Sequence, residues 1–205
     1  TEALTGKELA PDRAERIESL GDITVMGRFD GSVSGFKSDA VIATARGIAG
    51  GDLTFSPAGE GKTAFEGNLS LEDFDLGELF AVNGFGQGAV AGGVSGSFGN
   101  GDITLSTNAV IGRLEYGGYV YRNITLNGDF DNNFFTGHIG SSDPNLKFDF
   151  TGELDFNDSI PRFDFDMRRF NADLHRLGFN TRDSVSVIRC DLRAAGRGRS
   201  PDERH

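Results

Sequence analysis

The segment NLKFDFTGELDF, residues 145–156, constrains the fold most, because its apolar and polar residues alternate with a period of two. Side chains on a strand point alternately to opposite faces, so this pattern predicts a strand with one apolar and one charged face. Residues 146–156 would span roughly 33 Å, which is long for a strand of a globular protein. The apolar parity carries Leu146, Phe148, Phe150, Gly152, Leu154 and Phe156.

The composition excludes several classes of function. The net charge is −11, with 20 Lys and Arg against 31 Asp and Glu. Nucleic-acid binding and adsorption to an anionic membrane both need a basic surface, and the sequence offers none. The single cysteine, Cys190, rules out an internal disulfide and a cysteine-based zinc site within this chain.

Glycine and phenylalanine dominate the rest of the composition. Thirty glycines and five prolines indicate tight turns and bulges rather than disorder, and 18 phenylalanines stand beside two Met and no Trp. No apolar stretch is long enough to span a bilayer. The sequence begins without Met and ends in a polar tail, so we expect a fragment of a longer protein.

The pattern along the chain predicts a β-meander after a short helix. Residues 1–21 favour a helical segment, and from Asp22 the period is two. Turn sequences such as Asp30-Gly31 and Asn100-Gly101 separate the apolar runs, so the sheet should be mainly antiparallel. Ile23, Val25 and Phe29 give the first alternating strand. Further strands are predicted around residues 33–36, 40–46, 52–56, 63–71, 89–98, 102–107, 109–116, 118–130, 133–140, 146–156 and 162–168.

An internal repeat divides the predicted sheet into two modules, residues 22–99 and 100–205. The segment 23–30 matches 124–131 with an offset of 101 residues, and 74–80 resembles 170–179 with nearly the same offset. Each module ends in a short helical turn, near 75–82 and near 171–178. We interpret these turns as plugs whose Leu and Phe side chains cover the mouth of the sheet, rather than as separate binding sites.

Motifs that carry chemistry are incomplete in this sequence. The glycine-rich segment 84–88 lacks the spacing and the following helix of a nucleotide-binding loop, and a hairpin or bulge explains it better. The acidic residues are dispersed over one face of the predicted strands, so no carboxylate pair is indicated. His138 and His175 have no acid and nucleophile nearby in the sequence. We therefore expect no catalytic residue, no metal site and no cofactor, and a protein that is not an enzyme.

Three ordered motifs resemble the translocation and assembly module subunit TamB, in particular its Bacteroidetes versions. They are the strand Tyr-x-Tyr-x-Asn-Ile-x-Leu-x-Gly at 119–128, the alternating Leu-x-Phe-x-Phe-x-Gly strand from 146, and the turn Asp-Leu-x-x-Leu-Gly at 173–178. The resemblance is best over 118–196 and looser over the first half. The N-terminal anchor and the C-terminal domain typical of that family have no counterpart in this sequence.

The resemblance implies a part of a large envelope protein, anchored in the inner membrane of a Gram-negative bacterium and extended through the periplasm. TamB resembles the AsmA-like and bridge-like lipid transfer families, whose repeated strands build a long, curved, mostly antiparallel sheet with an apolar groove, a β-taco. Such a groove is thought to conduct phospholipid between the two membranes. The family also supports outer-membrane protein assembly with a partner of the Omp85 type.

The residues themselves leave the covering of the apolar face open. The same side chains would suit a lipid groove or the closed core of a sandwich or barrel, and for any single residue the core is favoured. A structural spacer, or a secreted adhesin or carbohydrate-binding β-domain, stays as an alternative function. Exposed edges of the sheet would also pair with another copy. The candidate groove residues are Ile124, Leu126, Phe130, Phe148, Phe150, Leu154, Phe156, Phe163 and Phe165, to which Leu69, Leu71, Val90, Val94 and Phe98 add further apolar positions.

Overall fold

The protein is described by a computed structural model, which places residues 21–32, 35–77, 84–180, 182–183 and 186–198. One eleven-stranded sheet contains every described strand, and each strand pairs with its sequence neighbours in antiparallel order. The predicted all-β, antiparallel fold is thus confirmed. The strands are β1 (Thr24–Ser32), β2 (Gly35–Thr44), β3 (Gly47–Pro57), β4 (Thr63–Asp75), β5 (Phe85–Gly99), β6 (Asp102–Tyr116), β7 (Tyr119–Asp131), β8 (Phe134–Ser142), β9 (Leu146–Asp155), β10 (Arg162–Asp173) and β11 (Val187–Arg197).

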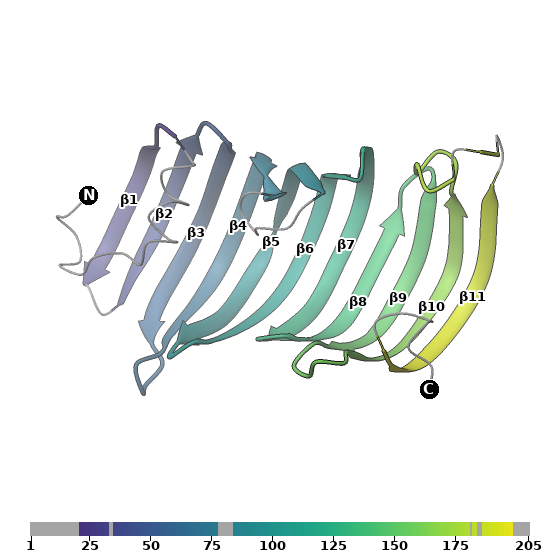
Figure 1. The fold of residues 1–205 in the computed structure, drawn as a ribbon. Helices are drawn as coiled ribbons and strands as arrows, with labels where there is room; N and C mark the ends of the chain where they lie inside the picture. The colour runs from purple at the N-terminus through teal and green to yellow at the C-terminus, as the bar shows by residue number, and fades with distance from the viewer. Residues whose placement is uncertain (1–20, 33–34, 78–83, 181, 184–185, 199–205) are drawn as a thin grey trace.

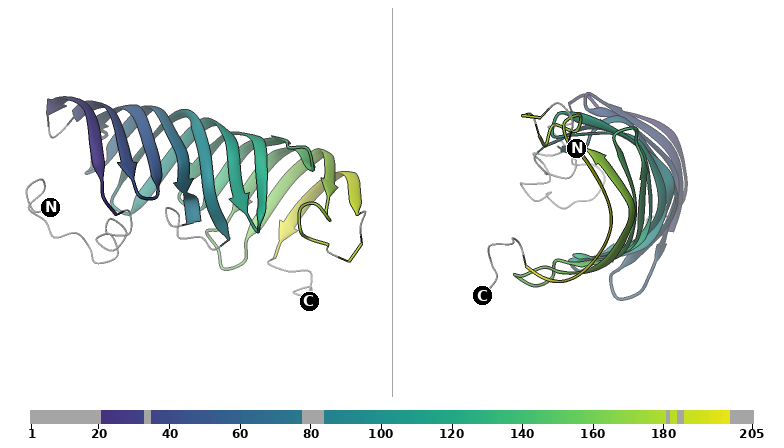
Figure 2. Two further views of the ribbon diagram at one scale, coloured as in Figure 1. Left: turned by 90° about the horizontal axis from the view of Figure 1, so that it is seen from above. Right: turned by 90° about the vertical axis from the view of Figure 1, so that its right-hand side faces the viewer.

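The sheet is long in one direction and bent in the other. Figure 1 shows the strands side by side from β1 to β11, and the end-on view in Figure 2 shows that each strand curves, so that the cross-section is a C. The open side of the C faces the viewer of Figure 1. Strands β1 and β11 each pair with one neighbour only, so the sheet does not close into a barrel. The long, curved and antiparallel sheet was predicted from the sequence, whereas the sequence had left undecided whether it stays open or closes.

Small residues permit the curvature at mid-strand. Gly128, Gly137 and Gly152 lie directly opposite one another on β7, β8 and β9. A Cβ atom at Gly152 would lie 2.4 Å from the carbonyl oxygen of Asp164, so no larger residue fits there without a shift. Glycine at such positions lets a strand bend sharply, and bent strands are what gives the sheet its C-shaped section.

The strands are longer than the sequence suggested. The predicted strands 33–36 and 40–46 belong to one strand, β2, and 102–107 and 109–116 form the single strand β6. The polar residues that seemed to break these runs, such as Asn108, lie within the strand and point to the solvent face. Strand β11 was not predicted, because Arg189, Asp191 and Arg193 give it the composition of a polar tail.

The two matched segments of the internal repeat lie six strands apart. Segment 23–30 lies in β1 and 124–131 in β7, and the second match relates the ends of β4 and β10. Asp73 in β4 and Arg169 in β10 both adopt left-handed φ angles, of 46° and 53°, and both mark a β-bulge. The predicted boundary at 99/100 falls in the hairpin between β5 and β6, whose strands pair from Gly99 to Phe85, so both modules share one sheet.

The helical segments predicted from sequence are reduced to turns where the structure describes them. Strand β10 continues to Asp173, and residues 174–178 form a turn in which the N–H of Leu177 donates to the carbonyl of Asp173 at 3.0 Å. This corrects the helix predicted near 171–178, because pairing with β11 keeps residues up to Asp173 extended. Residues 76–77 are helical, while 78–83 and the predicted helix at 1–20 lie outside the described residues. Within the described part of the chain, no helix has the length and hydropathy needed to cross a membrane.

Candidate functional site

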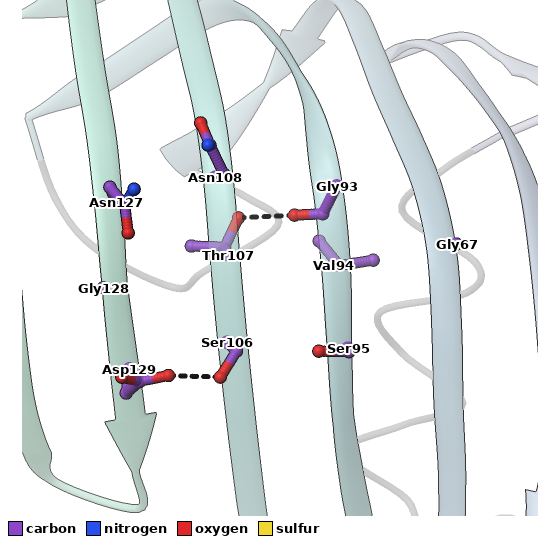
Figure 3. A pocket seen from close by; sticks show the side chains of 10 residues that line it. All are labelled: Gly67, Gly93, Val94, Ser95, Ser106, Thr107, Asn108, Asn127, Gly128 and Asp129. Atoms are coloured by element: carbon purple, nitrogen blue, oxygen red, sulfur yellow. Dashed lines mark hydrogen bonds between the residues drawn. The ribbon is translucent and has the colours of Figure 1, made fainter.

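The register places the apolar parity of every strand on the concave face. Figure 3 views the sheet from the opposite side to Figure 1, since β7 residues there lie to the left of β4. The labelled residues are small or polar apart from Val94, and they line a shallow depression of about 470 Å³ on the convex face. Ser106 donates a hydrogen bond to Asp129 in this depression, and Asn108 and Asn127 lie on adjacent strands. The polar parity therefore faces outward, and the apolar parity lines the groove.

One side of the groove is a wall of phenylalanine. The hairpins β1–β2, β3–β4, β5–β6, β7–β8 and β9–β10 all lie along the lower edge of the sheet in Figure 1, and strands on both sides of these turns place apolar side chains there. Rings of neighbouring strands are in contact: their centroids lie 4.7 Å apart for Phe36 and Phe55, and 4.8 Å apart for Phe130 and Phe135. We call this set the phenylalanine wall: Phe29, Phe36, Phe55, Phe65, Phe98, Phe130, Phe135, Phe163 and Phe165.

Several rings of the wall lie against glycines of the next strand. A Cβ atom at Gly96 would be 3.0 Å from the ring of Phe65, and one at Gly128 would be 2.6 Å from the ring of Phe135. An aromatic ring packed over a glycine restores the contacts that the missing side chain cannot make. Glycine thus serves two purposes on this face, because it allows the strand to bend and gives a neighbouring ring a surface to lie on.

The predicted groove residues all lie on or at the edge of the concave face. Phe150 is buried and contacts Phe165, with ring centroids 5.2 Å apart, while Phe148 stands opposite Ser141. Phe156 follows the end of β9, at the lower rim, and is largely exposed. The remaining members follow the register of their strands on this face: Leu126, Phe130, Leu154, Phe163 and Phe165 lie toward the wall or mid-strand, and Ile124 lies on the other side of the groove.

The list from sequence missed five members of the wall: Phe29, Phe36, Phe55, Phe65 and Phe135. Each of them lies within a few residues of a lower-edge hairpin and shares parity with the apolar residues of its strand. The turn sequences beside each of these residues predict that position. They do not predict the contacts across strands, because these depend on the register of each hairpin.

The other side of the groove is covered over β7. Leu177, in the turn after β10, packs with Tyr121, Ile124 and Ala172 in one buried cluster. Strands β8 and β9 lie between β7 and β10 in the sheet, so the turn must pass over both to reach Tyr121. We call the groove face beneath this turn the covered side, with Tyr121, Ile124 and Ala172 as its residues. Leu177 covers them, whereas Phe179 just after the turn is 68% exposed.

A polar network anchors the rim beside the covered side. The side chain of Asp143 is fully buried, and its carboxyl oxygens accept hydrogen bonds from the Tyr119 hydroxyl at 2.7 Å and from the N–H groups of Arg122 and Asn145 at 2.9 and 2.8 Å. The amide of Asn145 donates to the Tyr119 hydroxyl at 2.9 Å. Asp143 thereby joins the start of β7 to the turn between β8 and β9.

Ionisation of Tyr119 is expected to make the free energy of unfolding depend on pH in the alkaline range. Burial, together with the hydroxyl's hydrogen bond to Asp143, raises the pKa of Tyr119 above its usual value of 10.0. The neutral phenol is favoured in the folded state, so this contribution is intact below pH 10 and disappears as pH rises through the folded-state pKa. We expect the free energy of unfolding, measured with urea, to fall as the pH rises above 10, and Tyr119→Phe to make this fall shallower. An unchanged slope in Tyr119→Phe would show that the hydroxyl does not report this network.

The convex face carries the charges. Arg113 on β6 forms an ion pair with Asp73 on β4 at 2.8 Å. Lys62, in the turn before β4, forms one with Asp102 on β6 at 3.1 Å. Arg168 lowers the pKa of Asp166 by donating hydrogen bonds to it. A second depression, of about 330 Å³ and lined by polar residues such as Lys147, also lies on this face. The charged surface is thereby kept away from the groove.

Within the described residues, no group of three or more His, Cys, Asp or Glu side chains is arranged to hold a metal ion. Cys190 is exposed on the edge strand β11, opposite Phe170 of the groove face. Comparisons of the chain with protein-family models, with curated proteins and with solved structures gave no significant match.

Proposed function

We propose that this chain is a segment of a periplasmic conduit in the envelope of a Gram-negative bacterium, and that its concave face carries the acyl chains of phospholipids. The observation that supports the proposal is the exposure of large apolar side chains on the inner face of an open sheet, where Phe29 and Ile103 are 61% and 51% exposed. Water contact costs roughly 25 cal/mol for each Å² of such surface, so an apolar ligand that covers it is favoured.

The chemistry of the groove suits a ligand without hydrogen-bonding groups. Backbone N–H and C=O groups of β2–β10 are used in pairing on both sides, so the sheet offers an acyl chain no competing polar contact. The apolar residues recur in register on every strand, and a ligand would meet similar contacts along the whole length. Repeated, similar contacts favour movement along the groove over tight binding at one point.

The resemblance to TamB supplies the rest of the proposal. In this reading the parent protein is anchored in the inner membrane and acts with an Omp85-type partner in outer-membrane assembly. Catalysis has no part in it. The curvature and the repeat of the sheet support the same reading. The matched segments lie six strands apart, so equivalent strands run in the same direction and each repeat would extend one continuous groove.

Lipid carriage can be tested with variants of the paired strands β5 and β6. Ile103 lies on the groove face opposite Phe98, and Val110 lies on the convex face; both Ile103 and Val110 are 51% exposed. We expect native mass spectrometry of the protein purified from cells to detect bound phospholipid, and the double variant Phe98→Asp/Ile103→Asp to lose most of it. A carboxylate on the groove face would need water or a hydrogen-bond donor beside it, and an acyl chain has no group that donates a hydrogen bond.

The variant Val110→Asp serves as the control for charge and for stability. It should keep the bound phospholipid, because its carboxylate faces solvent away from the groove. The two variants should give the same circular dichroism spectrum, which shows that both are folded. Equal lipid content in the two folded variants would contradict the proposal. A folded protein that neither copurifies with lipid nor takes up fluorescent phospholipid would favour a structural spacer.

A further inference from the structure

We propose that over β6–β10 the acyl chains lie against the phenylalanine wall and are excluded from the covered side. The proposal rests on the proposed function and narrows it, since it assigns the contact residues to one side of the groove. The turn at 174–178 then occupies the covered side sterically and confines the acyl chains to the phenylalanine wall.

The first observation is the burial of the covered side. Tyr121 and Ile124 are 8% and 9% exposed, and Ala172 is 1% exposed, although all three belong to the groove face of an open sheet. Leu174 and Leu177 of the turn pack against this cluster, which leaves little apolar surface for a ligand. An acyl chain could enter only by displacing the turn, whose backbone is held by the bond from Leu177 to Asp173 and by one from Leu174 to Ser186.

The second observation is the exposure of the opposite side. At the lower rim, Ile103 is 51% exposed and Phe156 is 55% exposed, and no described element covers either of them. Phe130, Phe163 and Phe165 are half-buried, mainly by one another and by the rings beside them. Phe135 on β8 is the exception, because it is only 5% exposed and its ring packs against Phe130 and Phe150. A chain laid along the wall would therefore cross β8 over these neighbouring rings.

The geometry of one strand connects these two observations. Tyr121 and Phe130 both belong to β7 and both point into the groove, near opposite ends of the strand. They pair with Leu114 and Leu105 on β6, so their neighbours are equally apolar. Covering by the turn, and not hydrophobicity, is therefore the difference between the two positions.

Fluorescence quenching can distinguish the two sides, because the chain contains no Trp. Single reporters are introduced as Phe130→Trp and Tyr121→Trp, with Phe163→Trp as a second wall position in case Phe130→Trp folds poorly. Each protein is titrated with phosphatidylcholine brominated on its acyl chains, and unbrominated lipid serves as the reference. Bromine quenches Trp only at close contact, so we expect loss of emission for the wall reporters and little loss for Tyr121→Trp.

Each outcome decides the proposal. Similar quenching of the wall reporters and of Tyr121→Trp would overturn it and leave the lipid-carrying function intact, since lipid would then fill the whole width. Quenching of Tyr121→Trp alone would reverse the assignment. No quenching at any position, with no lipid bound in a parallel flotation assay, would count against the proposed function itself.

Discussion

The substitution Gly67→Ala is expected to lower the free energy of unfolding by about 3 kcal/mol or more. Gly67 has φ of +147°, a region that residues with a Cβ rarely adopt. A Cβ atom would also lie 1.8 Å from the carbonyl oxygen of Asp52 on the paired strand β3. Backbone atoms of a paired strand cannot move away without loss of the ladder between β3 and β4. Urea unfolding followed by circular dichroism measures the effect.

A second glycine provides the matched control for Gly67→Ala. Gly112 lies in the neighbouring sheet region, on β6, and a Cβ atom there would meet nothing within 4 Å. Gly112→Ala should therefore change the unfolding free energy by less than about 1 kcal/mol. If both variants were equally stable, the close approach to the carbonyl oxygen of Asp52 would not be what requires glycine at residue 67.

Loss of the Asp143 side chain is expected to have an effect of similar size. Asp143→Ala removes the acceptor of three hydrogen bonds and leaves the N–H groups of Arg122 and Asn145 without it. These three hydrogen bonds are part-buried and run to a carboxylate. A hydrogen bond to a charged group contributes about 1.5–3 kcal/mol, so we expect a loss of about 3 kcal/mol or more. The measurement is again urea unfolding, at pH 7, where the phenol of Tyr119 is neutral.

Asp155→Ala is the control for this second prediction. Asp155 accepts a hydrogen bond from the N–H of Asn157 at 3.0 Å in the hairpin between β9 and β10, where solvent reaches the group. Water replaces that acceptor, and we expect a cost of about 1 kcal/mol or less. A loss at Asp143 no greater than the loss at Asp155 would mean that water enters the network. Asp143→Asn should fall between the two, because the amide keeps one acceptor oxygen.

The two positions bear on function through the shape of the groove. Gly67 lies between Leu53 on β3 and Val94 on β5, so a backbone shift there would disturb the strand pairing that positions the phenylalanine wall. Asp143 fixes the position of the first residues of β7, where the ring centroids of Tyr119 and Tyr121 lie 4.7 Å apart. Weakening of this end of β7 would loosen the covered side, where Leu177 packs.

Local sequence features predicted much of the fold. The alternation in 146–156 predicted β9 and its two faces, and pairs such as Asn100-Gly101 marked the hairpin between β5 and β6. Strand β11 and the full length of β6 were missed for a local reason. Arg189 and Asp191 in β11, and Asn108 in β6, are polar residues on strands, and composition alone does not separate such residues from a loop.

The candidate site was predicted in part. The apolar residues of β7, β9 and β10 were recognised because each repeats with a period of two within its own strand. Phe135 and Phe65 were missed, since their significance lies in rings on other strands and in the glycines beneath them. The burial of Ile124 was also invisible, because the residue that covers it, Leu177, is more than fifty positions away in the chain.

The sequence by itself determined that this protein is a meander of antiparallel strands with one apolar face, because alternation and turn chemistry act between near neighbours in the chain. Only the tertiary structure decided how that face is used. The register aligned the phenylalanines along one edge, the glycines met at the bend, and the turn after β10 crossed two strands to cover the other side. Each of these depends on contacts between strands, and the free energy of such contacts is fixed only when the whole sheet has formed.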